Sequence, residues 1–342
     1  AKLIDGMRVR GYSEEFARQI FRQIEGFGEY GFPESHSASF ALLVYVSAWL
    51  KRHEPAAFTA ALLNSQPMGF YSASQLTQDA RRHGVEIRPV DINRSDWDCT
   101  LEAGPERQAA MRLGLRMVKG LAEESGRRIA DRRGKEGYTS IQQLLERTGL
   151  DRRELGVLAS AGALEVLEGH RHRARWSVAG VEQPTPLLVS MDRYEAAPLL
   201  RKPTEGQNIV ADYQSLGLTL ERHPIQLLRH RLDRYRYVQA EHLEGLKNGM
   251  KISVAGLVIT KQRPGTASGV IFVTLEDETG YINLVVWNKI AERDRPALLN
   301  ARLLGVHGEL QIEGQVIHVV ADRLIDHTEM LGNLVTRSRD FR

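Results

Sequence analysis

The feature that most constrains the fold is a series of short segments near the carboxyl end in which apolar and polar residues alternate. Alternation with a period of two is typical of β-strands that bury one face. Between the third and fourth of these segments, the pattern changes to that of a helix. We expect strands at 251–261, 270–277, 281–287, 302–312 and 316–321, and the helix over Ile290–Leu299.

Three strands, one helix and two strands is the order of an OB barrel, a small barrel that commonly binds single-stranded nucleic acid. The alternation places Phe272, Tyr281 and Trp287 on the outer face of the barrel, where aromatic rings can stack on bases at about 1–3 kcal/mol per base. Lys261 and Arg263 flank this face at the first loop. Packing against neighbouring helical domains is an equally good explanation of the aromatic residues. Both interpretations stay open at this point.

A second constraint is the stretch ASFALLVYVSAWL at 38–50, which is apolar on almost every side. A helix of this kind is either buried in a large protein or spans a membrane. About a dozen residues are too few for the roughly 20 that a bilayer requires. We therefore expect a helix buried inside a soluble protein, capped at Ser35 or Ser37 and followed by a second helix that starts at Pro55.

Ser35, His36 and Ser37 stand at the start of this apolar helix, where unpaired amides and the positive end of the helix dipole attract anions. Lys51 and Arg52 stand at its end, and we consider them candidates for the same surface. The simpler explanation is that the serines cap the helix and that His36 satisfies a neighbouring group. The spacing alone favours this simpler explanation.

The segment from Arg107 to Trp176 is helical in pattern and basic, with 15 Lys and Arg against 9 Asp and Glu in a chain whose net charge is only +3. Two glycine-centred turns within it, VKGLA at 118–122 and LASAGAL at 158–164, resemble a tandem helix-hairpin-helix module that grips a DNA backbone through hairpin amides. Ordinary helical hairpins and a solvated basic face are the alternatives. The candidate DNA-binding residues are Lys119, Gly120, Arg127, Arg128, Gly162, Arg171 and Arg173.

Composition excludes several classes of protein. A single cysteine, Cys99, leaves no disulfide framework or cysteine-rich metal site, which favours a reducing compartment such as the cytoplasm. We find no signal peptide, lipidation motif or membrane span. The chain begins at Ala1 within a helical pattern, and we therefore expect it to be a piece of a longer protein.

The fold class that we expect is a multidomain α+β protein with helical, mixed and β-barrel parts. The predicted domains are a helical part at 1–65, a small α/β subdomain at 66–106, the tandem hairpin module at 107–180, a connector with helices at 181–249, the OB-fold domain at 250–326 and a basic tail at 327–342.

The stretch YGFPESHSASFALLVYVSAWLKRHEPAAF resembles the fingers of bacterial C-family DNA polymerases, the relatives of the polymerase III α subunit. The continuation LLNSQPMGFYSASQLTQDARRHGVEIRPVDINRSDWDC is similar to the error-prone, damage-inducible branch of that family. The likeness continues through GLRMVKGL, ASAGALEVLEGHRHRARW, RPGTASGVIFVTLEDETG and TRSRDFR, and it covers nearly the whole chain.

The resemblance implies a DNA-directed DNA polymerase, a nucleotidyltransferase that uses two Mg²⁺ ions on the carboxylates of a palm domain. It places the palm and a phosphoesterase-like domain upstream of Ala1, so that this piece carries no catalytic residues and is inactive alone. It makes Ser35, His36, Ser37, Lys51 and Arg52 candidates for proximity to the incoming nucleotide.

The resemblance also implies partners: primer-template DNA, a partner similar to Y-family polymerases and a RecA-like accessory protein, in damage-induced mutagenesis and translesion synthesis. The segment QPTPLL at 183–188 fits a clamp-binding peptide poorly, so we expect contact with the sliding clamp to be indirect. Two alternatives remain: a non-enzymatic DNA-binding or scaffolding module, or part of a replicative polymerase III α subunit.

Overall fold

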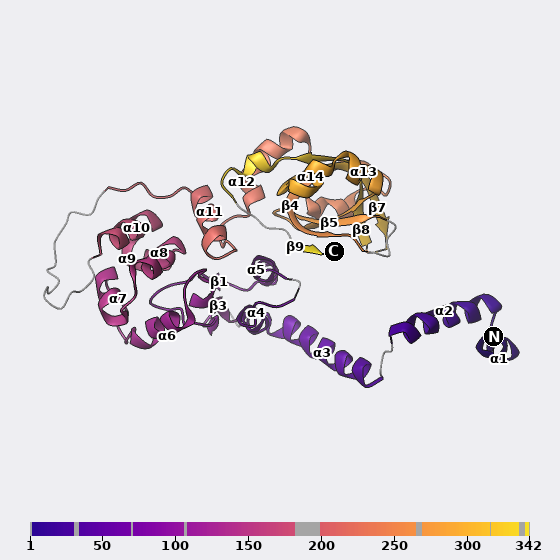
Figure 1. Cartoon of the computed structure of the whole chain (residues 1–342), viewed down its shortest axis with the longest axis horizontal. Helices are drawn as coiled ribbons and strands as arrows, with labels where there is room; N and C mark the ends of the chain where they lie inside the picture. The colour runs from indigo at the N-terminus through magenta and orange to yellow at the C-terminus, as the bar shows by residue number, and fades with distance from the viewer. Residues whose placement is uncertain are drawn as a thin grey trace. The chain divides into compact units, whose positions relative to one another are not determined.

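The chain divides into two units, Ala1–Thr59 and Ala60–Arg342, and each is described by itself. Figure 1 labels their helices and strands. The computed structural model describes residues 2–30, 34–69, 71–105, 108–181, 199–264, 269–314, 316–334 and 339–341.

The described part of the first unit is helical, as the sequence predicts. Its helices are α1 (Lys2–Val9), α2 (Glu14–Tyr30), α3 (Glu34–His53) and the start of α4 (Pro55–Asn64). Pro55 is the first residue of α4, a position at which its missing N–H costs nothing. Because α3 begins at Glu34, Ser35 and Ser37 lie in its first turn, and the prediction that one of them caps the helix is wrong.

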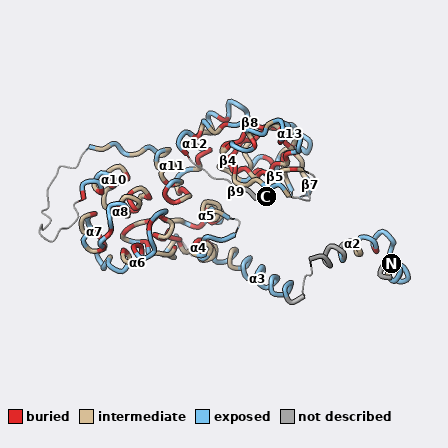
Figure 2. The backbone as a smooth tube through the Cα atoms, viewed as in Figure 1, coloured by how far each residue is buried: buried red, intermediate tan, exposed pale blue. Residues whose placement is uncertain are grey.

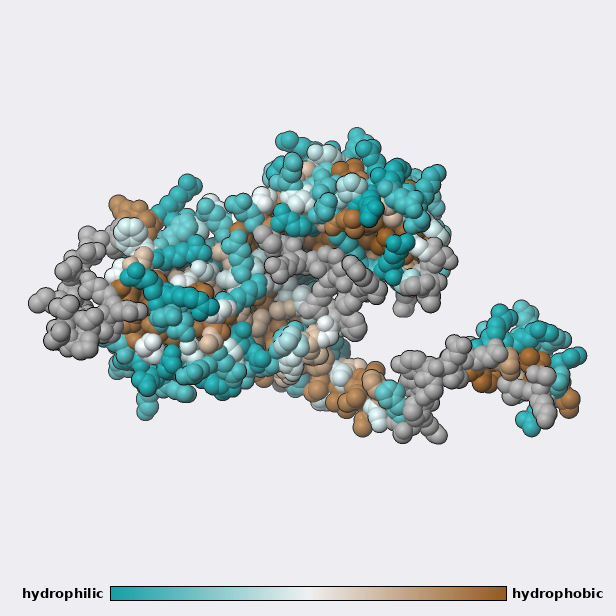
Figure 3. All heavy atoms as spheres, viewed as in Figure 1, coloured by the Kyte–Doolittle hydropathy of each residue, from teal (hydrophilic) through white to brown (hydrophobic). Residues whose placement is uncertain are grey.

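Helix α3 is exposed within these 342 residues, so the described part of the chain does not provide the burial that the sequence predicts. Figure 2 draws most of α3 as exposed, and Figure 3 shows hydrophobic atoms gathered along it. An apolar helix surface is stabilised when another part of the protein packs against it. The sequence of the helix alone does not show which surface that is. The exposed large apolar side chains of α3 are Phe40, Leu42, Leu43, Val44, Tyr45, Val46 and Trp49, which are between 44% and 70% exposed.

The second unit starts with a small α/β region. Its helix α5 (Ala73–Arg82) begins with the predicted capping box, in which Ser72 and Gln75 each accept a backbone N–H from the other. A three-stranded sheet follows, with β3 in the centre, parallel to β1 and antiparallel to β2. The strands are β1 (Ile87–Arg88), β2 (Thr100–Glu102) and β3 (Ala110–Arg112), so the sheet includes residues on both sides of the predicted boundary at 106.

A helical module surrounds the two predicted hairpins. Its core is made of fully buried side chains such as Ile129, Leu144, Leu155 and Leu158. The module contains the 3-10 helix η1 (Leu115–Met117) and helices α6 (Glu123–Arg132), α7 (Ile141–Thr148), α8 (Arg152–Ser160), α9 (Glu165–Glu168) and α10 (Arg171–Gly180).

The predicted connector contains more regular structure than its proline content suggests. Thr204 and Gln207 form a capping box at the start of its first helix. The elements are α11 (Glu205–Ser215), α12 (Pro224–Leu232) and the 3-10 helices η2 (Asp233–Tyr235) and η3 (Ala240–Gly245). The poorly fitting clamp segment at 183–188 lies outside the described residues.

The OB barrel has the predicted order of elements. Strands pair in the order β5–β6–β8–β7–β4, and an additional β4–β5 pairing closes the barrel. The predicted helix between the third and fourth strands is divided at Asp294. The elements are β4 (Lys251–Gln262), β5 (Ile271–Glu276), β6 (Tyr281–Val286), α13 (Asn288–Arg293), α14 (Arg295–Asn300), β7 (Leu303–Glu313) and β8 (Val316–Asp326).

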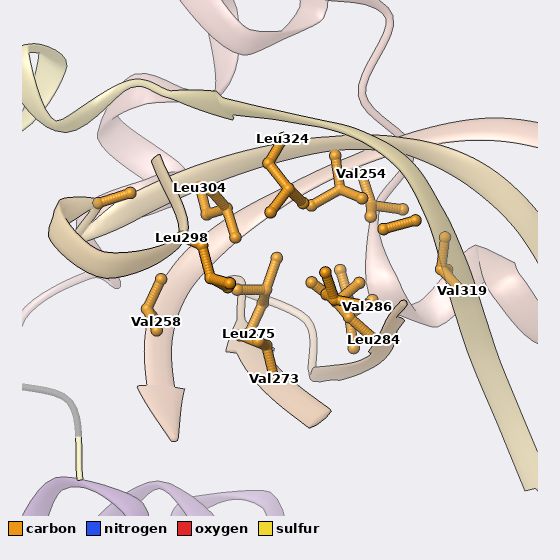
Figure 4. Packing of buried hydrophobic residues seen from close by; sticks show 14 of the residues in the cluster. Val254, Val258, Val273, Leu275, Leu284, Val286, Leu298, Leu304, Val319 and Leu324 are labelled. Atoms are coloured by element: carbon orange, nitrogen blue, oxygen red, sulfur yellow. The ribbon is translucent and has the colours of Figure 1, made fainter. Parts of the chain in front are cut away.

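The barrel core consists of the inward members of each alternating strand. Figure 4 shows side chains from several strands, including Val254, Leu275, Leu284 and Val319, which meet in the interior. Leu298 of α14 adds to this cluster and closes the barrel. Because successive residues of a strand point to opposite faces, filling this core leaves the alternate residues outside.

The predicted basic tail is partly structured. His327 is buried, and the 3-10 helix η4 (Thr328–Leu331) follows it. Strand β9 (Arg339–Phe341) pairs in parallel with the end of β4. The tail therefore extends the sheet by one strand, a long-range pairing that its local composition does not indicate.

Candidate nucleic-acid interface

The first hairpin is the turn at 118–122 between η1 and α6. Gly120 has φ +86°, a conformation that residues with a β-carbon rarely adopt. Ala122 occupies the N-cap position of α6 and provides no side-chain acceptor, so the first amides of this helix are left for water or an anion. Glu123 and Glu124 follow in the first turn and oppose an anion electrostatically.

Lys119 of the first hairpin has partners within the chain. Its backbone N–H donates to the carbonyl oxygen of Ser215 at 2.8 Å, and its ammonium donates to the carbonyl oxygen of Tyr213 at 2.8 Å. Both acceptors lie at the carboxyl end of α11, where positive charge favours the helix dipole. Lys119 therefore attaches the hairpin to α11, a role that the sequence does not reveal.

The second hairpin turns at Gly162, which has φ +80°. A β-carbon there would lie 2.9 Å from Nη2 of Arg171, so the side chain of Arg171 crosses directly over the turn. Arg171 is only 8% exposed, forms an ion pair with Asp212 and donates to the carbonyl oxygen of Asn208 at 2.9 Å. Glu165 Oε1 lies 3.4 Å from its Nε atom. A guanidinium buried among these partners cannot reach a phosphate, so we assign Arg171 to the fold and withdraw it as a DNA contact.

The remaining candidate arginines of this module lie at its surface. Arg127 is exposed and pairs with Glu123 at 2.7 Å, and Arg128 is half-buried with its Nη1 3.5 Å from Glu124. Arg173 is also partly exposed. Exposed pairs four residues apart on a helix contribute only about 0.3–0.5 kcal/mol and are screened by salt. A phosphate can therefore compete for these side chains.

The outer face of the barrel carries the predicted aromatic residues. Phe272 is 41% exposed, Tyr281 is 37% exposed and Trp287 is 54% exposed. Phe272 lies opposite Val285 in the antiparallel β5–β6 pair, and Ile282, Leu284 and Val286 are buried. The predicted orientation of these strands is confirmed, and the role of the face in binding bases stays a prediction.

The two basic residues at the end of β4 differ in their surroundings. The ammonium of Lys261 donates to the carbonyl oxygen of Leu299 at 2.9 Å, at the carboxyl end of α14. Arg263 is exposed just after the strand ends. Residues 265–268 of the loop that follows lie outside the described residues.

Tyr281 is consistent with both interpretations of the aromatic face, base stacking and packing against a helical region. The guanidinium carbon of Arg82, in the last turn of α5, lies 5.1 Å from the centroid of the Tyr281 ring. This is a cation–π contact between the α/β region and the barrel. Arg82 is not among the residues predicted from the sequence, because no local pattern relates a helix at 73–82 to a strand almost 200 residues later.

Glu276, at the end of β5, is a second residue that the sequence did not indicate. Its side chain is buried, with 2% exposure, and burial raises the pKa of the carboxyl group to about 7, against an opposing effect of Arg82. Its Oε1 atom has no hydrogen-bond partner among the described residues. Glu276 lines a cavity of about 530 Å³ together with Lys119 and Tyr213.

The candidate residues of the first unit lie at opposite ends of α3. His36 and Ser37 are exposed in the first turn, and the ring of His36 contacts that of Phe40 at a centroid distance of 4.3 Å. Ser35 lies in the same turn. Lys51 and Arg52 lie in the last turn, about 24 Å along the helix from Ser35. The structure therefore does not bring the two groups together on one surface.

The described residues contain no group of three or more His, Cys, Asp or Glu side chains that could hold a metal ion. The Mg²⁺ that the resemblance implies stays a prediction. Among the helices described, we find none with the length and apolar character needed to cross a membrane.

Two parts of the second unit match known families. Residues 84–174 match a family described as the helix-hairpin-helix motif, and residues 252–326 match one described as the OB-fold nucleic acid binding domain. A hairpin module joined to an OB barrel defines a nucleic-acid-binding protein of mixed α+β class, and the predicted fold class is confirmed.

Over its whole length the chain is similar to curated proteins named error-prone DNA polymerase. It is 58% identical to the one from Methylococcus capsulatus over 359 residues, which cover 100% of this chain and 34% of that protein. The identity is 56% for Alkalilimnicola ehrlichii (99% and 33% covered) and 55% for an Azoarcus species (99% and 32% covered). The chain is thus a homologue of the error-prone DNA polymerases, as the resemblance predicted, and it spans about a third of their length.

Proposed function

We propose that this chain supplies the DNA-binding parts of an error-prone, DNA-directed DNA polymerase. The observation that carries the proposal is the presence of a helix-hairpin-helix match and an OB-fold match within a chain that is 58% identical, end to end, to an error-prone DNA polymerase. The finer role that we infer is nucleotide insertion opposite damaged templates during damage-induced mutagenesis.

In this proposal the hairpin module holds duplex DNA by its backbone. The first hairpin offers Gly120 and the uncapped amides of α6, and Arg127, Arg128 and Arg173 add positive charge at the surface. Contacts of this kind position the duplex without reading its bases. Gly162 contributes to the second turn but lies beneath Arg171, so we place the duplex at the first hairpin.

The barrel holds the unpaired strand in the same proposal. Phe272 and Trp287 project from its outer face, which is where OB folds commonly bind oligonucleotides. Bases of any sequence can stack on such rings, which suits a polymerase that must accept altered templates.

We assign the joining of nucleotides to carboxylates outside these 342 residues. We expect this piece to contact other polymerase domains through the exposed apolar face of α3. A Y-family-like partner, a RecA-like accessory protein and indirect contact with the sliding clamp follow from the resemblance, as does a cytoplasmic location. The same exposed face favours the second candidate function, a scaffolding module that docks on another protein.

Replacing Arg127 and Arg128 with alanine is expected to weaken duplex binding and to make it less sensitive to salt. Each lost contact with a duplex phosphate makes the slope of the logarithm of the binding constant against the logarithm of the salt concentration shallower by about 0.9. The slope of the double variant should therefore be shallower than that of the wild type by up to about 1.8. The measurement is fluorescence anisotropy with a blunt duplex between about 50 and about 200 mM salt. Lys251→Ala is the matched control, because it removes an exposed, ion-paired charge from the barrel. An unchanged slope in the double variant would exclude the first hairpin as the duplex site.

Replacing Phe272 and Trp287 with alanine is expected to weaken single-strand binding and to leave duplex binding intact. Loss of one stacked base costs about 1–3 kcal/mol, so each substitution should reduce affinity for oligo-dT about five- to 150-fold. Val316→Ala is the control, because Val316 is 60% exposed at the start of β8 and is not part of the aromatic face. Wild-type affinity in both aromatic variants would show that the face packs against protein instead.

A further inference from the structure

A cavity of about 420 Å³ lies where α5, the segment at 219–226 and the barrel meet. Three arginines line it: Arg81 and Arg82 from the last turn of α5, and Arg222 from the segment before α12. We call these three residues the arginine cradle. None of them belongs to the hairpins, and no sequence pattern relates Arg222 to the other two.

Each arginine of the cradle is held by one partner and keeps other donors for a ligand. Arg81 donates from Nη1 to the carbonyl oxygen of Leu220 at 3.1 Å, and Arg82 lies over the ring of Tyr281. Arg222 donates to Glu205 at 2.8 Å and 2.5 Å. A guanidinium has five N–H donors in a fixed plane, so each side chain is oriented while its remaining N–H groups stay available for an oxyanion.

The acidic residues of the cavity do not cancel this charge. Glu278 accepts from Arg229 at 2.6 Å and 2.7 Å and is neutralised by that pair. Glu205 pairs with Arg222 in the same way, and Glu221 is exposed at the rim. Arg81 and Arg82 therefore carry the excess of positive charge in the cavity, and Arg222 contributes its remaining N–H donors.

The histidine of the cavity adds a donor and no charge. Burial lowers the pKa of His223 to about 4, so the ring is neutral near pH 7. Its Nδ1 accepts the N–H of Ile225 at 3.2 Å, which leaves the proton on Nε2, and Nε2 has no hydrogen-bond partner in the described part of the chain. The walls therefore present an excess of donors and positive charge, which is the chemistry that recognises phosphate.

The cradle is continuous with the aromatic face of the barrel through the contact between Arg82 and Tyr281. Tyr281 begins β6 and Trp287 follows its end, about 20 Å away along the strand. We propose that the arginine cradle binds phosphodiester groups of a single strand that runs along this aromatic face. The inference rests on the proposed single-strand binding by the barrel and assigns to it a second contact site.

The test replaces Arg81 and Arg222 with alanine and leaves Arg82 on Tyr281. With an oligo-dT of about 12 nucleotides, within the range that OB folds cover, the slope of log K against log salt should become shallower by about 0.7 for each lost contact, or about 1.4 in total. The lysine double variant should keep most of the slope, because it keeps the charge. Arg231→Ala is the matched control, since Arg231 is an exposed arginine of α12 that does not line the cavity.

Three results are distinguishable. If the wild type does not bind oligo-dT, the proposed function fails, and this inference fails with it. If the wild type binds, the aromatic variants bind more weakly and the arginine variant keeps the wild-type slope, the cradle alone is refuted. If the arginine variant loses affinity only for free tripolyphosphate and not for oligo-dT, the cavity binds a free polyphosphate, and the single-strand assignment is overturned. Thermal unfolding of each variant checks that the fold is retained.

Discussion

Replacing Arg171 with methionine is expected to lower the free energy of unfolding by about 3–5 kcal/mol, because breaking a buried ion pair leaves its partner uncompensated. That partner is Asp212, which is 6% exposed and, among the described residues, would keep the hydroxyl of Thr219 as its side-chain donor, at 2.5 Å. Arg171 also holds α10 to α11 through the carbonyl oxygen of Asn208, and methionine cannot donate to it.

Urea unfolding measures this loss of stability. Two further variants test whether the loss comes from the unpaired carboxylate of Asp212. Arg171→Met combined with Asp212→Asn should recover most of the loss, because replacing both members of a buried pair is often nearly neutral. Arg127→Met is the surface control and should change stability by no more than about 0.5 kcal/mol. A single Arg171 variant as stable as the wild type would mean that this pair does not hold the second hairpin.

Replacing Glu276 with glutamine is expected to stabilise the protein above pH 7 by up to about 3 kcal/mol, because each tenfold change in proton affinity corresponds to about 1.4 kcal/mol. The ordinary pKa of a glutamate is 4.5, and burial raises the pKa of Glu276 to about 7 in the folded protein. The unfolded chain therefore ionises while the folded chain still holds the proton, so stability falls as the pH rises from about 4.5 to about 7. Glutamine is neutral throughout and removes this loss.

Stability measured by urea unfolding between about pH 4 and about pH 8 tests the prediction. His223 acts in the opposite direction: its pKa is lowered to about 4, so stability is lost as the pH falls from 6.5 towards 4. The two trends offset each other in the wild type, and Glu276→Gln should therefore reveal a protein that becomes less stable on acidification. Glu313→Gln, at an exposed position, is the control. Parallel pH curves for Glu276→Gln and the wild type would contradict the assignment.

The order and orientation of the barrel strands could be predicted because alternation is a local property. Val273 and Leu275 point inward, and Phe272 points outward, for the same reason that any alternate residues of a strand do. The capping box of Ser72 and Gln75 was likewise readable within four residues. The division of the barrel helix at Asp294 and the pairing of β9 were not, because each depends on residues brought from elsewhere in the chain.

The sequence indicated which basic and aromatic residues are candidates for the site. It did not indicate which of them face a ligand and which hold the fold together. Arg127 and Arg171 look alike in a basic helical segment, yet one is exposed and the other is buried against Asp212. Lys119 looked like a phosphate contact and instead donates to carbonyl oxygens of α11. Arg82 was overlooked because its partner, Tyr281, belongs to another domain.

By itself, the sequence determined which segments become strands and helices, which faces are apolar, and to which family of polymerases the chain is related. Only the tertiary structure decided which cations remain available to a ligand, since a side chain such as Arg171 takes the partner that folding places beside it. The physical reason is range: periodicity and capping act over a few residues, whereas burial and ion pairing depend on segments that the chain brings together from far apart.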